Sequence, residues 1–203
     1  MVSGTNEFYD EIAESWYNIR HWTIFRSELQ KLNQEWQGSL LNIGCAHGSD
    51  FVPFNSNKFR FFGIDSSKEL VLLSKKYAQK KDFVFQNCAG DMRYLPFLDS
   101  SMDYIICIAS LHHLIQRKER LQALKEMKRV ARKEIFITVW NRENKDLPNK
   151  KTIDREWKHR GQVLKRQYYL YDKDEFQREL EEAGFFAEVW SDKRNIFALI
   201  KLK

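Results

Sequence analysis

Five short apolar runs, each separated from the next by a polar or helical stretch, constrain this chain most. They are SLLNIG, FRFFGID, DFVFQNC, MDYIICIAS and EIFITVW, at residues 39–44, 59–65, 82–88, 102–110 and 134–140. Most are continuously apolar rather than alternating, which is typical of strands buried on both faces. Residues 66–80 and 117–133 have the apolar spacing of amphipathic helices. This order predicts an α/β fold with a doubly wound, mostly parallel sheet.

The C-terminal part departs from this alternation. Residues 172–185 predict a helix with Gly184 at its end, and residues 185–191 and 195–202 predict two more strands. Their connection is so short that these strands must be antiparallel, because a parallel return needs a crossover of about a dozen residues. We therefore expect seven strands with an antiparallel C-terminal strand. With two N-terminal helices in residues 1–37, we expect the 203 residues to form a single domain, 1–203.

Charge and cysteine content narrow the class of protein. The net charge is +6, and residues 142–166 hold nine Lys or Arg against four Asp or Glu. This cluster, like that at 117–133, suits a polyanion such as nucleic acid, and a solvated helix face with a mobile loop explains it equally well. Three scattered cysteines predict neither a disulfide framework nor a metal site. Without a membrane-spanning run or a signal peptide, we expect a cytoplasmic protein that does not enter a membrane.

Small and acidic residues follow four of the predicted strands. They are Gly44-Cys45-Ala46-His47-Gly48, then Asp65, then Gly90-Asp91-Met92, and then Ser110-Leu111-His112-His113. In an open α/β sheet, ligands bind at the carboxyl ends of the strands. Gly44 and Gly48 suit a tight turn that approaches a ligand closely, and Asp65 stands where a carboxylate binds the ribose hydroxyls of an adenosine cofactor. A polar turn or a helix cap is the structural alternative for both Asp65 and Asp91.

These segments resemble the motifs of class I S-adenosylmethionine-dependent methyltransferases, which have a Rossmann-like fold. LLNIGCAHG, FFGID, NCAGDMRYLPF and SMDYIICIASLHHL match the four motifs in order. The resemblance implies S-adenosyl-L-methionine as cofactor and a binding site made by Gly44, Ala46, Gly48, Asp65, Ser66, Asp91, Met92 and Ala109. Asn42 and Ala46 stand where the common pattern has an acidic residue and glycine, so we expect weaker cofactor binding.

A narrower resemblance is to the tRNA methyltransferases that esterify 5-carboxymethyluridine at the wobble position, in a short archaeal-type form. FYDEIAESWYNIR, IASLHHL, VWNREN and RQYYLYDKDEFQRELEEAGF carry it. It implies the anticodon loop of tRNA as substrate. It also implies a small zinc-binding activator protein, which would pair with the edge strand near Phe83–Asn87 as a heterodimer. A loop or helix covering that edge is the alternative.

A carboxylate acceptor is already ionised, so the enzyme needs groups that hold it rather than a base. We expect Arg20 as a clamp, His112 beside the acceptor, and Trp140 and Asn141 to stack on and read an extruded base. We expect residues 142–170 to form a basic, aromatic segment on the substrate side. Each of these side chains also has a structural explanation, as an ion-pair, core or strand-end residue.

Two other functions remain open from the sequence. The chain can be a methyltransferase of a small metabolite, which the basic segment and RQYYLY disfavour. It can also be a non-catalytic binding subunit with a methyltransferase fold, for which Asn42 and Ala46 are the only support. The sequence does not specify which tRNAs are used, the accepting atom, or whether the chain is stable without a partner.

Overall fold

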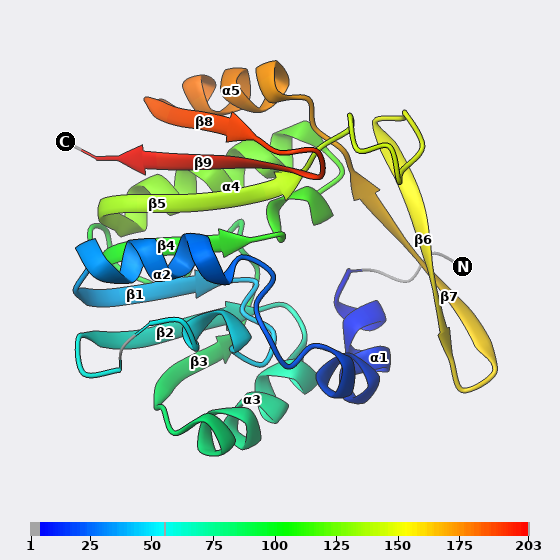
Figure 1. Cartoon of the computed structure of the whole chain (residues 1–203), viewed down its shortest axis with the longest axis horizontal. Helices are drawn as coiled ribbons and strands as arrows, with labels where there is room; N and C mark the ends of the chain where they lie inside the picture. Colours follow the sequence, from blue (N-terminus) through cyan, green and yellow to red (C-terminus); the bar gives the residue numbers. More distant parts are fainter. Residues whose placement is uncertain (1–4, 55, 203) are drawn as a thin grey trace.

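The computed structural model describes residues 5–54 and 56–202 and contains the seven-stranded sheet that the sequence predicts (Figure 1). Its strands, in spatial order, are β3 (Phe85–Ala89), β2 (Phe59–Asp65), β1 (Gly38–Ile43), β4 (Met102–Ile108), β5 (Ala131–Trp140), β9 (Asn195–Lys201) and β8 (Ala187–Ser191). Strands β1 to β5 pair in parallel, whereas β9 is antiparallel to both β5 and β8. The expected α/β fold with an antiparallel C-terminal strand is therefore confirmed.

Helices cover both faces of this sheet. They are α2 (Arg26–Glu35), α3 (Lys68–Lys81), α4 (Arg117–Val130) and α5 (Lys173–Glu182). One core joins α4 and α5 to one sheet face, and a second, aromatic core joins α2 and Trp36 to the other. Every residue of β4 is buried, which explains why its sequence is apolar apart from Asp103. None of the described helices is long and apolar enough to cross a membrane.

Strand order reverses between β1 and β4, because the chain runs outward from β1 through β2 to β3 before it returns to pair β4 with β1. The segments that follow β1 and β4 therefore run to opposite faces of the sheet and leave a crevice where ligands bind in such folds. Helix α1 (Thr5–Ile19) lies beside this end of the sheet (Figure 1). Asp10 attaches α1 to the start of α3 by accepting hydrogen bonds from the Ser67 hydroxyl, at 2.6 Å, and the Glu69 amide, at 3.1 Å.

Most of the basic segment forms a β-hairpin, which the sequence did not predict. Strands β6 (Thr152–His159) and β7 (Gln162–Tyr169) pair antiparallel and stand off the sheet alongside α1 (Figure 1). Arg160 and Gly161 connect them with positive φ angles of 47° and 77°, the backbone of a two-residue hairpin turn. The Trp157 indole packs 5.7 Å from that of Trp16 and donates a hydrogen bond to the Ser15 hydroxyl. Packing against α1 thus orders a segment whose sequence suggests a loop.

Two element boundaries differ from the expectation. Strand β3 starts at Phe85, because Asp82 ends α3 in a left-handed conformation and Phe83 turns into the aromatic core. Helix α4 ends at Val130, and Arg132 and Lys133 belong to β5, where both pair with the buried carboxylate of Asp103. Residues 1–4 and 203, which belong to the expected N-terminal helical region and the single domain, lie outside the described residues.

Candidate active site

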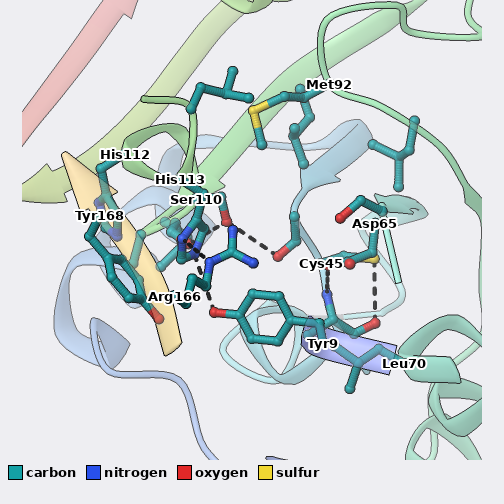
Figure 2. Close-up of a pocket in the computed structure, with 18 of the residues that line it drawn as sticks. Tyr9, Cys45, Asp65, Leu70, Met92, Ser110, His112, His113, Arg166 and Tyr168 are labelled. Carbon is teal, nitrogen blue, oxygen red and sulfur yellow. Dashed lines mark hydrogen bonds between the residues drawn. The ribbon is translucent and has the colours of Figure 1, made fainter. Parts of the chain in front are cut away.

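A cavity of about 670 Å³ opens at the carboxyl ends of the central strands (Figure 2). Its walls come from the ends of β1, β2 and β4, the turn after β3, helix α1 and strand β7. Binding sites for small ligands and cofactors commonly enclose about 300–1,000 Å³. The cavity is therefore large enough to be the ligand site that the strand order predicts.

The turn after β1 requires glycine at position 44. Gly44 has a φ of 73°, and a Cβ atom there would lie 2.1 Å from the Ser110 hydroxyl oxygen. Ala46, where the common pattern has glycine, adopts the same left-handed region with a φ of 46°. Its methyl group packs into the apolar cluster of Phe8 and Leu70. The alanine therefore keeps the geometry of the turn at a conformational cost of about 1 kcal/mol.

Asp65, the last residue of β2, lies on the wall of the cavity. Its carboxylate accepts hydrogen bonds from the Ala46 amide at 2.7 Å and the Ser67 amide at 2.9 Å. Burial raises the pKa of this carboxyl, and the two amides oppose that rise. Each oxygen keeps a lone pair, so the carboxylate is a fixed acceptor on the cavity wall. With the glycine turn beside it, this arrangement fits the ribose of an adenosine cofactor.

The turn after β3 places Asp91 and Met92 on the same wall. Both Asp91 carboxylate oxygens accept hydrogen bonds from the Arg93 guanidinium. Burial raises the pKa of the Asp91 carboxyl, but the hydrogen bonds from Arg93 outweigh burial and hold this pKa below its usual value. Arg93 also pairs with Glu119 at the start of α4. An adenine amine would therefore meet a carboxylate already shared with an arginine.

Most of the residues predicted from the sequence line this one cavity. They are Arg20, Gly44, Ala46, Asp65, Ser66, Asp91, Met92, Ala109, His112 and Trp140. Gly48 and Asn141 do not. Gly48 lies under the turn, where a Cβ would be 3.2 Å from the Phe85 ring. The Asn141 amide instead donates to the Asp192 carbonyl and accepts from the Glu143 amide, both at 3.0 Å.

His112 stands at the far end of the cavity, after β4. Its Nδ1 atom accepts a hydrogen bond from the Trp140 backbone amide at 3.2 Å, so the proton of the neutral ring is on Nε2. That Nε2 atom is buried and has no hydrogen-bond partner among the described residues. Burial, together with the charge of Arg166, lowers the pKa of His112 to about 3. The ring is therefore neutral at physiological pH and presents one unused donor.

Arg166 of β7 is a site residue that the sequence analysis missed. It is only 4% exposed, and its guanidinium lies 4.5 Å from the centre of the Tyr9 ring (Figure 2). Its Nε donates to His113 Nδ1 at 3.1 Å, and His113 Nε2 lies 3.4 Å from the Tyr9 hydroxyl. Burial lowers the pKa of His113, and Arg166 adds to this effect. A permanent cation therefore forms part of the cavity wall.

Aromatic rings complete this end of the cavity. Trp140 and Tyr168 stack with ring centres 4.6 Å apart, and His112 lies 4.8 Å from Trp140. Tyr168 therefore already covers one face of the indole on which we expected a base to stack. Leu164, Arg166 and Tyr168 alternate along β7 and face α1 and the cavity. This alternation is visible in QVLKRQYY and was the available signal for Arg166.

Comparison with known proteins agrees with this geometry. The methyltransferase domain family matches residues 41–137. A protein of Encephalitozoon cuniculi named as a methyltransferase is 27% identical over 97% of this chain and 94% of its own length. The tRNA (carboxymethyluridine(34)-5-O)-methyltransferase of Xenopus tropicalis is 30% identical over 75% of this chain, which spans only 23% of that protein.

Solved structures share the fold at low sequence identity. A S-adenosylmethionine-dependent methyltransferase from Clostridium acetobutylicum superposes with a TM-score of 0.71 at 12% identity, covering 97% of this chain and 96% of that one. A methyltransferase of Haloferax volcanii, solved in complex with the activator Trm112, superposes with a TM-score of 0.68 at 15% identity. The match covers 98% of this chain and 97% of that one.

The strand order, the glycine turn and the carboxylate after β2 define a class I methyltransferase fold. Residues 41–137 match the methyltransferase domain family, and the fold is that of S-adenosylmethionine-dependent methyltransferases, with S-adenosyl-L-methionine as the cofactor. Within that class the chain is similar to tRNA carboxymethyluridine methyltransferases over part of its length.

Proposed function

We propose that this methyltransferase esterifies the carboxylate of 5-carboxymethyluridine at the wobble position of tRNA. The observation that carries the proposal is the pairing of two groups at one end of the cavity. There the Arg166 guanidinium lies near the neutral His112, whose Nε2 donor is unused among the described residues. A cation and a hydrogen-bond donor suit an anionic acceptor group.

The protonation state of His112 supports a carboxylate rather than a hydroxyl acceptor. An imidazole with a pKa of about 3 is a poor base near pH 7, whereas a carboxylate is ionised there without help. S-adenosylmethionine supplies an electrophilic methyl group. Arg166 and His112 would hold the accepting oxygen in line with that group, and the rings of Tyr9 and Trp140 would exclude water.

The hairpin supports RNA as the bearer of that carboxylate. Lys158 and Lys165 are exposed on the hairpin, whose opposite face packs against α1 beside the cavity. These cations suit the phosphates of an anticodon stem-loop, and the basic excess of residues 142–170 adds to them. The similarity to tRNA methyltransferases points in the same direction.

A small zinc-binding activator is the partner that we propose for the edge strand β3. Strand β3 pairs with β2 on one side only, so the backbone groups of its other side are available to a further strand. Leu72 on α3 is 69% exposed and Val84, just before β3, is 86% exposed. The Haloferax volcanii methyltransferase with the same fold was solved with such an activator.

The test is co-expression with a Trm112-type activator, followed by an assay on tRNA that carries 5-carboxymethyluridine. Nucleoside mass spectrometry should show a gain of one methyl group on the wobble nucleoside. Arg166→Gln should lower this activity about 100-fold, because it removes a charged hydrogen bond to the acceptor. Lys31→Gln, on the exposed surface of α2 and outside the hairpin, is the control and should retain activity. Methylation of free metabolites but not of tRNA would overturn the proposal.

A further inference from the structure

The cavity contains a second pair of opposite charges, Arg20 and Asp50. Arg20 follows the last turn of α1 and stacks on Trp16, with the guanidinium 5.2 Å from the ring centre. Asp50 belongs to the 3₁₀ turn Ser49–Phe51 that follows the glycine turn. The glycine turn lies between Asp50 and the end of β1, and Asp50 and Arg20 line the same cavity as Asp65.

Asp50 is a half-buried carboxylate whose negative charge is only partly balanced by its neighbours. Burial raises the pKa of its carboxyl, while polar contacts with Thr23 and Asn42 and the charge of Arg20 oppose that rise. The Asn42 side chain is fully buried, and neither of its polar atoms makes a hydrogen bond of normal geometry within the described residues. No ion pair within 4 Å joins Arg20 to Asp50, although both residues are described. Each charge can therefore still accept a partner of opposite sign.

Asp50 lies close to Asn42, the residue that replaces the acidic side chain of the common pattern. The common methyltransferase pattern has an acidic residue at position 42, and in this chain that side chain is a neutral amide. Asp50 stands eight residues later, but its carboxylate faces the Asn42 amide at the end of β1. The negative charge that is absent at position 42 is thus present at nearly the same place in space, on a different residue.

We propose that Asp50 binds the α-ammonium group, and Arg20 the α-carboxylate, of the methionine part of the cofactor. The two groups of an α-amino acid share one carbon atom, so their receptors must be a close pair of opposite charges that do not neutralise each other. Arg20 and Asp50 meet this requirement in the same cavity. The proposal gives Arg20 a role at the cofactor instead of the substrate, and rests on the cofactor alone and not on tRNA.

Calorimetric titrations with three ligands distinguish the contribution of Asp50 to binding from that of Arg20. S-adenosylhomocysteine carries both groups, its desamino analogue keeps only the carboxylate, and 5′-methylthioadenosine lacks the amino-acid part. Asp50→Asn should weaken S-adenosylhomocysteine about 10- to 100-fold and leave the other two ligands unchanged. Arg20→Gln should weaken both carboxylate-bearing ligands by a similar factor and leave 5′-methylthioadenosine unchanged.

A charge exchange provides the second variant. The double substitution Asn42→Asp with Asp50→Asn returns the carboxylate to the usual position, and should recover most of the affinity for S-adenosylhomocysteine. Asp99→Asn, at an exposed site in the loop before β4, should bind all three ligands like the unmodified protein.

Unchanged binding of S-adenosylhomocysteine by Asp50→Asn would overturn the proposal. So would an equal loss of all three ligands, because the effect would then not depend on the ammonium group. No RNA is present in these titrations. Their outcome is therefore independent of whether tRNA is the substrate.

Discussion

The Nδ1 atom of His112 accepts a hydrogen bond from the backbone amide of Trp140, which ties the turn after β4 to the end of β5. A backbone amide can only donate, so this contact determines which ring nitrogen carries the proton. The remaining donor, Nε2–H, is buried and has no partner among the described residues. A main-chain contact between two neighbouring strands thus determines the hydrogen-bonding role of a side chain of the cavity.

Replacing His112 by Phe should remove that donor while keeping the ring in place. We expect kcat to fall about 10- to 100-fold, because a hydrogen bond to a charged acceptor is worth roughly 1.5–3 kcal/mol. S-adenosylhomocysteine affinity, measured by calorimetry, should be unchanged. Because the pKa of His112 is about 3, the kcat profile of the unmodified enzyme should show no step from this residue between pH 6 and 9. A step near pH 6.5 that disappears in His112→Phe would contradict this assignment.

His47 should make the fold sensitive to acid. It is buried against Tyr17 and Tyr77, and burial lowers its pKa to about 4. The unfolded chain, with a histidine pKa near 6.5, binds the proton more readily below that pH, so stability falls as pH falls. One such histidine costs about 2 kcal/mol between pH 7 and pH 5. Urea denaturation at both pH values should show this loss reduced by about that amount in His47→Leu. An identical loss in both proteins would exclude the effect.

Gly44→Ala should destabilise the protein more than Gly161→Ala. Both glycines have positive φ angles, but a Cβ at 44 overlaps Ser110, whereas nothing lies within 4 Å of one at 161. We expect about 1 kcal/mol for Gly161→Ala from backbone strain alone. Gly44→Ala should cost roughly 3 kcal/mol, because it adds steric overlap. Guanidinium denaturation measures both, and equal values would mean that Ser110 moves away without cost.

Arg120→Met should be strongly destabilising. Arg120 and Glu179 are each 1% exposed and pair at 2.6 Å, and Arg120 also donates to the carbonyls of Leu114 and Ile115, just after the histidines. Loss of one buried partner typically costs about 3–5 kcal/mol. Arg194→Met breaks an exposed pair with Asp146 and should cost under about 1 kcal/mol. If the denaturation curves of the two variants coincide, the buried pair does not contribute more to the free energy of unfolding than the exposed pair.

Val84→Asp should weaken the proposed activator complex at least about tenfold, since it places a charge beside the β3 edge. Phe186→Asp is the matched control, because Phe186 is 85% exposed and stands just before β8, the opposite edge of the sheet. Co-purification followed by titration of the separated chains measures both affinities. If Phe186→Asp is the more damaging change, the activator uses the other edge.

Much of the fold could be predicted because the pattern of apolar residues within a short segment shows which of its side chains are buried. A strand with both faces covered, such as β4, is apolar except where a charge has partners, as Asp103 does, and the end of the apolar run marks where the next turn begins. The same logic located Gly44, Asp65 and His112 at strand ends, and all three line the cavity. The hairpin was not predicted, because its exposed strands mix charged and apolar residues and depend on α1 for packing.

By itself, the sequence determined the alternation of strands and helices, the fold class, the cofactor and ten residues that line the cavity, because these follow from residues close together in the chain. Tertiary structure decided how distant residues combine. Tyr9, His113 and Arg166 meet only because β7 folds back against α1. Asp50 likewise reaches Asn42 only through the turn between them. A side chain's charge and hydrogen-bonding role depend on the groups that surround it in space, and no local pattern encodes that set of neighbours.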